Sequence, residues 1–109
     1  METSALLRLV SEGTRHSLLE RLRQGEKTVT ELVAALGDEQ SNISHHLGAL
    51  REAGLVAATR RGRQQVYRLA DPEVARVLGE VAALAAHLEQ VAYLSRLGLP
   101  AGSGFHGYG

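Results

Sequence analysis

The feature that most constrains the fold is the stretch from Asp38 to Val56, which carries a helix start, two contrasting helix faces and a helix stop. Asp38 is a residue type that caps helix N-termini, and Gly54 can adopt the left-handed conformation that ends helices. Apolar residues recur at helical spacing on one face, beside His46, at Ile43, Leu47 and Leu50. Another face repeats the same spacing with small polar residues, namely Ser41, Ser44, His45 and Gly48.

The polar face of this predicted helix has an unusual composition for a solvent-exposed surface. A helix that only needs to stay in solution usually carries Glu and Lys outside, because both are good helix formers. Short side chains that donate and accept hydrogen bonds instead suit a helix pressed into the major groove of DNA. The alternative is an ordinary surface helix with a poorly optimised outer face, which this helix taken alone does not exclude.

The segments after this helix make the pattern more specific. The sequence reads Gln40-Ser41-Asn42-Ile43-Ser44-His45-His46-Leu47, then Leu50-Arg51-Glu52-Ala53-Gly54-Leu55-Val56, then Arg61-Gly62-Arg63 and Val66-Tyr67-Arg68-Leu69. These motifs resemble the recognition helix and wing of the ArsR/SmtB family of bacterial winged-helix repressors, and the likeness covers most of residues 5–90. The resemblance implies a homodimeric transcriptional repressor that binds operator DNA in the cytoplasm.

Charge is distributed unevenly along a chain of zero formal net charge. Residues 1–50 hold 5 basic and 7 acidic groups, residues 51–68 hold 5 arginines against Glu52, and residues 69–109 hold 2 basic against 4 acidic groups. All of the positive excess therefore lies at the end of the recognition helix and in the segment after it. A local basic stripe is sufficient to attract phosphates, although an ordinary solvated charge run is the alternative.

The remaining elements follow from caps and periodicity. Residues 3–11 predict a short amphipathic helix, Thr14 is a candidate cap for the next helix, and Thr28 with Glu31 has capping-box spacing for the supporting helix. Two strands are predicted at 55–59 and 64–69 around a basic turn. The fold class is therefore mainly α with a small β-hairpin wing, a winged helix-turn-helix.

A long C-terminal helix is predicted from Asp71-Pro72, a cap followed by proline, to about Leu97. Its apolar stripe is wider than a small monomer can cover, so we expect a homodimer formed through the first and last helices. Two-fold pairing sets two recognition helices roughly 34 Å apart and predicts a palindromic operator. The domain prediction is residues 1–97 for DNA binding and dimerisation, with 98–109 as a flexible, glycine-rich tail.

The predicted DNA contacts come from the recognition helix and from the wing. Major-groove contacts are expected from Gln40, Ser41, Asn42, Ser44 and His45. Backbone contacts are expected from Arg60, Arg61 and Arg63. His46 lies on the core side of the helix and is interpreted as a partly buried structural residue.

A metal site is implied by the resemblance, because members of the family commonly release DNA when a metal binds. The site at the start of the supporting helix uses cysteines, and Thr28 and Thr30 replace them here. The site across the dimer is partly matched: Asp71 and His87 keep their positions in the family pattern, whereas Glu73 and Leu84 replace two of its histidines. The candidate ligands are Asp71, Glu73, His87 and, from the tail, His106.

This mixed ligand set favours nickel, cobalt or manganese, with zinc as a further candidate, at the dimer interface. The alternative is that Glu73 and Glu80 are solvated and His87 makes an ordinary interfacial hydrogen bond. The chain has no cysteine, no signal peptide and no apolar run of spanning length, so we expect an intracellular protein without a membrane segment. No nucleophile and base pair or phosphate-binding loop is evident, which argues against an enzyme. A protein-interaction module is the other alternative.

Overall fold

The structure is a computed structural model that describes residues 1–100, and it divides the chain into two compact units. The first unit, Met1–Ala75, contains four helices and three strands, and the second begins at Arg76 within the last helix. The elements are α1 (Thr3–Ser11), α2 (Gly13–Arg23), β1 (Lys27–Thr28), α3 (Val29–Leu36), α4 (Gln40–Glu52), β2 (Val56–Arg61), β3 (Gln64–Leu69) and α5 (Pro72–Arg96).

The capping box predicted for α3 is confirmed. The Glu31 backbone N–H donates to the Thr28 hydroxyl at 3.1 Å, and the Thr28 N–H donates to the Glu31 carboxylate at 2.8 Å. The predicted cap of α2 is wrong, because α2 begins at Gly13, one residue before Thr14. The side chain of Glu12 caps this helix by accepting the backbone N–H of Arg15 at 2.8 Å.

The predicted cap of the recognition helix is also wrong. Helix α4 begins at Gln40, and its N-cap residue is Glu39, whose side chain makes no capping hydrogen bond. Asp38 lies one residue too early and instead accepts the Glu39 N–H at 2.7 Å and the amide of Asn42 at 2.5 Å. The predicted stop is confirmed, since Gly54 follows the helix with a φ of 84°.

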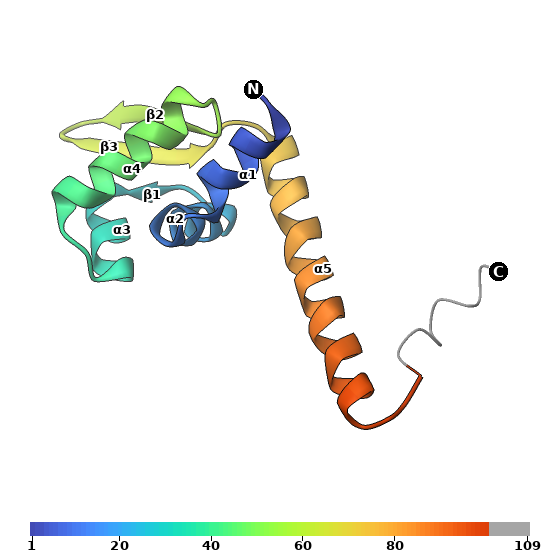
Figure 1. Cartoon of the computed structure of the whole chain (residues 1–109). Coiled ribbons are helices and arrows are strands. Elements are labelled where there is room, and N and C mark those ends of the chain that lie inside the picture. Colours follow the sequence, from blue (N-terminus) through green and yellow to red (C-terminus); the bar gives the residue numbers. More distant parts are fainter. Residues whose placement is uncertain (101–109) are drawn as a thin grey trace. The chain divides into compact units, whose positions relative to one another are not determined.

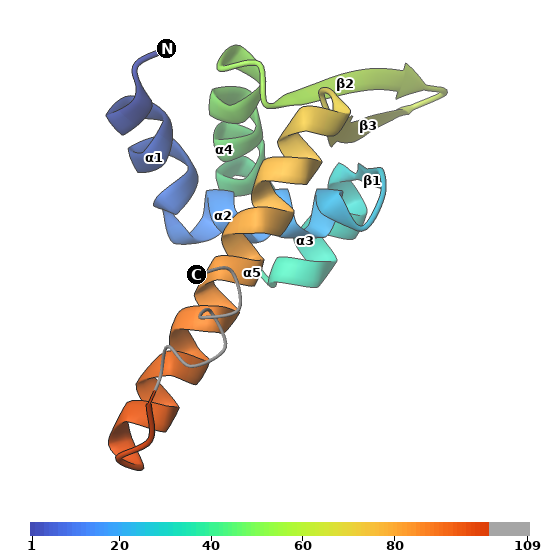
Figure 2. The same cartoon turned by 90° about the vertical axis from the view of Figure 1, so that its right-hand side faces the viewer.

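The wing is a hairpin of β2 and β3, paired in register from Val56 opposite Leu69 to Arg61 opposite Gln64. Strand β2 runs two residues further than the predicted 55–59, so Arg60 and Arg61 lie in the strand and not in the turn. Gly62 makes the turn with a φ of 63°. Strand β1, which was not predicted, pairs with β3 and completes a sheet of order β1-β3-β2. The hairpin lies beside α4 (Figure 1), and its tip projects beyond α3 and α4 (Figure 2).

The core of the first unit is aliphatic and confirms the stripe predicted for the recognition helix. Six side chains have no solvent exposure, and they come from α2, α3 and α4: Leu18, Leu19, Leu32, Ile43, Leu47 and Leu50. Tyr67 and Val66 of β3 are also buried, so the sheet closes this core. Helix α4 is therefore fixed to the unit along one face.

Helix α5 begins at Pro72 as predicted, with the Asp71 carboxylate accepting the Glu73 N–H at 2.6 Å. None of its residues is buried within one chain. Val81, Leu84 and Leu88 are 54%, 56% and 55% exposed, which leaves an apolar stripe along the helix. No described helix has the length and apolar character that a membrane crossing requires.

Candidate nucleic-acid interface

The recognition helix α4 presents the two faces that its sequence predicts. Helix α3 packs against it, and the stripe of Ile43, Leu47 and Leu50 is buried. On the outer side, the small polar set is exposed: Ser41, Ser44, His45 and Gly48. Because these side chains are short, the backbone of α4 can come close to a groove surface.

The predicted groove residues differ in how freely they can move. Gln40, Ser41, Ser44 and His45 are exposed. Asn42 is half-buried, and its amide nitrogen donates to Asp38 at 2.5 Å. This bond is also the main reason that the pKa of Asp38 lies below its ordinary value. Asn42 must exchange this partner before it can donate the same proton to a base.

The three predicted wing arginines are all exposed, but they have different partners. Arg61 forms a two-pronged ion pair with Glu26: Arg61 Nη1 contacts Glu26 Oε1, and Nη2 donates to Oε2 at 3.2 Å. The Arg61 hydrogen bond lowers the pKa of Glu26, and Glu26 raises the pKa of Arg61. Among the described residues, Arg60 and Arg63 have no side-chain hydrogen bond or ion pair. Two of the three cations are therefore free for phosphates.

The wing also carries Arg68, whose Nη1 donates to the hydroxyl of Thr59 on the neighbouring strand at 2.8 Å. This contact holds the guanidinium along the sheet surface. Figure 2 shows the hairpin from the side, with its tip extending past the ends of β1 and α3. The basic side chains thus lie on a projecting element, where a nucleic-acid backbone can reach them.

A polar cluster that sequence reasoning missed lies behind α4. Arg15 Nη1 is 3.2 Å from His46 Nδ1, and Arg15 Nε donates to the backbone oxygen of Leu9 at 2.5 Å. Glu12 Oε1 is 3.9 Å from His46 Nδ1. The side chain of His46 is 12% exposed, as expected for a core-side histidine. Arg15 and His46 are 31 positions apart, so no local pattern could pair them.

Within residues 1–100, the candidate metal ligands of one chain do not come together in a site. Among residues 1–100, no group of three or more His, Asp or Glu side chains lies close enough to hold a metal ion. Asp71 and Glu73 are exposed and His87 is half-buried. His106 falls outside the described residues.

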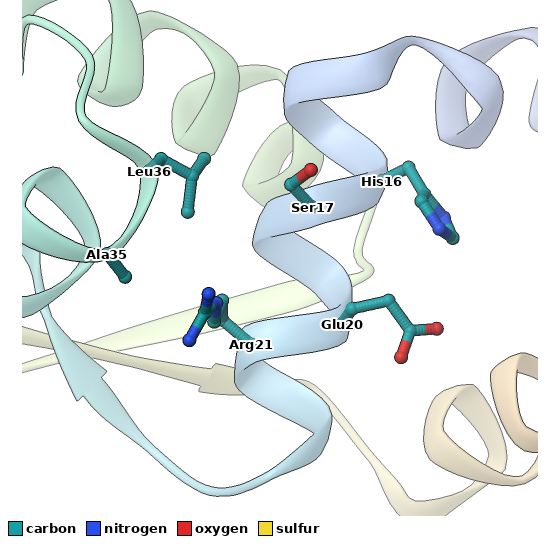
Figure 3. A pocket seen from close by; sticks show the side chains of 6 residues that line it. All are labelled: His16, Ser17, Glu20, Arg21, Ala35 and Leu36. Atoms are coloured by element: carbon teal, nitrogen blue, oxygen red, sulfur yellow. The ribbon is translucent and has the colours of Figure 1, made fainter.

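A cleft of about 360 Å³ lies between α2 and α3, lined by His16, Ser17, Glu20, Arg21, Ala35 and Leu36. It contains none of the predicted DNA or metal residues. Glu20 pairs with Arg23 at 2.9 Å. Figure 3 shows the Glu20 and Arg21 side chains leaving α2 in different directions. Opposite charges that do not converge select no ligand class, so we assign this cleft no function.

Comparison with known proteins gives consistent matches. The sequence pattern described as bacterial regulatory protein, arsR family, matches residues 12–58. The HTH-type transcriptional regulator NmtR of Mycobacterium tuberculosis is 40% identical over 87 residues, which cover 80% of this chain and 72% of NmtR. The regulator CmtR of Mycobacterium bovis is 46% identical over 84 residues, covering 74% and 71%.

A solved structure matches as well. The homodimeric winged helix-turn-helix DNA-binding domain of Mb0332 from Mycobacterium bovis aligns with a TM-score of 0.71 and 37% sequence identity. The alignment covers 79% of this chain and 87% of that domain. Sequence and fold thus point to the same class of protein.

Proposed function

This chain belongs to the ArsR family of bacterial regulatory proteins, and we propose that it represses transcription by holding an operator between its recognition helices and wings. It is a winged helix-turn-helix transcriptional regulator that binds DNA as a homodimer. The observation that carries the operator proposal is the exposed small polar face of α4, opposite its buried stripe and beside a projecting basic hairpin.

Each element of the interface has a separate task in this proposal. Gln40, Ser41, Asn42, Ser44 and His45 would read base edges in the major groove. Arg60, Arg61 and Arg63 would bind the adjacent sugar-phosphate backbone, which adds affinity without sequence preference. Residues 1–97 would act as one DNA-binding and dimerisation domain, followed by the tail.

The exposed stripe of α5 supports a dimer through this helix, together with α1, where Leu7 is 59% exposed. A two-fold dimer presents two copies of α4 to successive major grooves, roughly 34 Å apart, so the operator would be palindromic. A repressor must reach the chromosome, which places its action in the cytoplasm. The named relatives are transcriptional regulators, and the proposal includes no catalytic activity.

The test is binding of the purified, metal-free protein to DNA from its own promoter, followed by fluorescence anisotropy. We expect tight binding to one palindromic segment and at least a hundredfold weaker binding to a scrambled duplex of equal length. Equal affinity for both duplexes would contradict the operator proposal and favour an interaction module with a nonspecific basic surface.

We further propose that a divalent transition metal acts as inducer at the dimer interface. Asp71, Glu73 and His87 would hold it, with His106 as a candidate fourth ligand, and a second subunit would contribute, since residues 1–100 of one chain bring no three ligands together. Carboxylate and imidazole donors suit nickel, cobalt, manganese or zinc. Metal that binds the free dimer more tightly than the DNA complex must weaken DNA binding by the same factor.

The metal proposal is tested by titrating each of the four metals into the protein and DNA complex, with a chelator to reverse the effect. Release of DNA by one metal, and loss of that release in His87→Ala, is the expected result. Leu84 occupies a position that is a metal ligand in the family pattern. If none of the four metals releases the DNA, the proposal of a metal inducer is refuted, while the proposal of a repressor stands.

A further inference from the structure

A polar bridge connects the end of α1 to the middle of the recognition helix. Arg15, in the first turn of α2, donates from Nε to the backbone oxygen of Leu9 and from Nη1 to Nδ1 of His46. We propose that this bridge positions α4 relative to α1, and thereby relative to the recognition helix of the second subunit. The inference rests on the proposed function, because it concerns how two recognition helices reach one operator.

The chemistry of the contact sets its direction. A guanidinium has only donors, so in this hydrogen bond Arg15 donates and His46 Nδ1 accepts. The carboxylate of Glu12 accepts the Arg15 backbone N–H, and its Oε1 lies 3.9 Å from His46 Nδ1. The backbone hydrogen bond from Arg15 is the main cause that lowers the pKa of Glu12, and the positive charge of Arg15 is a further one. With only 12% of the His46 side chain exposed, water competes weakly for this hydrogen bond.

The bridge adds a polar contact to a helix that is only partly covered within one chain. No residue of α1 is fully buried, and its apolar side is half-buried at Ala5, Leu6, Leu9 and Val10. Leu9 lies among the last four residues of α1, whose carbonyl groups have no partner inside the helix, and Arg15 supplies one. Helix α1 packs against α2, so Arg15 is the polar link from this pair to α4.

The consequence for binding follows from dimer geometry. If α1 lies in the dimer interface, the angle between α1 and α4 sets the distance between the two recognition helices. Binding at the second half-site is then effectively intramolecular, and its strength depends on how well both helices fit at once. Loss of the bridge should weaken binding to a full operator while affecting a single half-site much less.

The experiment uses the full chain and two probes. The first is a palindromic duplex selected by the wild-type protein from a randomised library, and the second is the same duplex with one half-site scrambled. The variants are His46→Leu, which fills similar volume without an acceptor, and His46→Asn, whose amide oxygen lies close to the place of Nδ1. His45→Leu is the matched control, because it alters the neighbouring residue on the groove side of α4.

We expect His46→Leu to lower the ratio of full-site to half-site affinity by about tenfold, since a hydrogen bond to a charged group is lost in each subunit. His46→Asn should keep the ratio within about threefold of the wild type. His45→Leu removes one groove contact from each subunit, so its fold loss on the full site should equal the square of its fold loss on the half-site, without the extra loss expected of His46→Leu. Arg15→Met is the second variant, for the case that His46→Leu does not fold, and it should lower the ratio as His46→Leu does.

Two results would overturn the inference: an unchanged ratio in His46→Leu or Arg15→Met, or an equal loss in His46→Asn and His46→Leu. Each variant should sediment as a dimer and give the circular dichroism spectrum of the wild type. A changed affinity ratio then reflects the position of α4 and not a loss of dimerisation or folding. Failure of the wild type to select any duplex would refute the proposed function and the bridge's role together. Wild-type selection with an unaffected ratio in the variants would refute the bridge alone.

Discussion

Replacing Arg61 with alanine tests whether the wing binds the DNA backbone. In the free protein Arg61 is paired with Glu26. To bind a phosphate, the guanidinium must leave this carboxylate or contact both groups at once. The variant removes one cation from each wing and leaves an unpaired carboxylate beside the binding surface. We therefore expect weaker binding to every sequence and a smaller dependence of affinity on salt.

The size of the salt effect follows from counterion release. The logarithm of the association constant falls with the logarithm of salt concentration by about 0.9 for each phosphate neutralised on duplex DNA. A dimer has two wings, so losing both Arg61 contacts should reduce the slope by about 1.8. Between about 50 and 200 mM salt, the affinity advantage of the wild type over the variant should therefore shrink about twelvefold.

Fluorescence anisotropy over this salt range measures the slope, and Glu26 supplies the complementary variants. Glu26→Gln removes the competing carboxylate and should tighten binding without lowering the slope. The double variant Glu26→Gln/Arg61→Ala should keep the reduced slope and recover part of the affinity that Arg61→Ala loses. Arg23→Ala is the control, because Arg23 is also paired with a glutamate, Glu20, but lies on α2.

An Arg61→Ala protein with the wild-type slope would refute the wing assignment. Weaker DNA binding by Glu26→Gln would refute the claim that Glu26 competes with phosphates for Arg61. It would mean that Glu26 instead orients the guanidinium toward the DNA. A reduced slope in Arg23→Ala would show that the effect reflects overall charge rather than the wing.

Four further results are expected. Leu47→Ala should cost about 2–5 kcal/mol of unfolding free energy in urea denaturation, because Leu47 has no exposed surface. Leu84→Glu should shift sedimentation from dimer to monomer, since Leu84 lies on the exposed apolar stripe of α5. Ser44→Ala should reduce discrimination between operator and scrambled DNA while leaving the salt slope intact. The hydrogen bond from the Thr28 backbone N–H lowers the pKa of Glu31 in the folded protein. The stability that Glu31 contributes is therefore complete above the ordinary glutamate pKa of about 4.3 and is lost as the pH falls through the lower pKa of the folded state. Glu31→Gln should flatten the acid side of a profile of melting temperature against pH.

The parts of the fold that could be predicted from the sequence are those with a local cause. The stripe of Ile43, Leu47 and Leu50 shows helical period, and burial of that stripe follows from it. The capping box of α3 needs only two residues three positions apart. Cap positions elsewhere shifted by one or two residues: Glu12 caps α2 in place of Thr14, and α4 begins after Glu39 with no side-chain cap at all.

The parts that could not be predicted depend on residues distant in the chain. Strand β1 has two residues, too few for alternation to be visible, and it exists because β3 offers an edge. Glu26 and Arg61 are 35 positions apart, and only the fold brings them together. The sequence therefore predicted the wing arginines as a group but could not show that one of them is already paired.

This pairing bears on how a repressor with zero net charge distinguishes its operator from other DNA. Nonspecific binding is almost entirely electrostatic, so the free cations of the wing set the affinity for any duplex. The short side chains of α4 carry no charge at their exposed face apart from His45 when protonated, and they contribute only where base edges match. In this proposal Glu26, by holding Arg61, should lower affinity for all DNA, whereas a change at Ser44 should lower it for the operator alone. The salt slope and the specificity ratio therefore report on different elements of one interface, and each can be altered without the other.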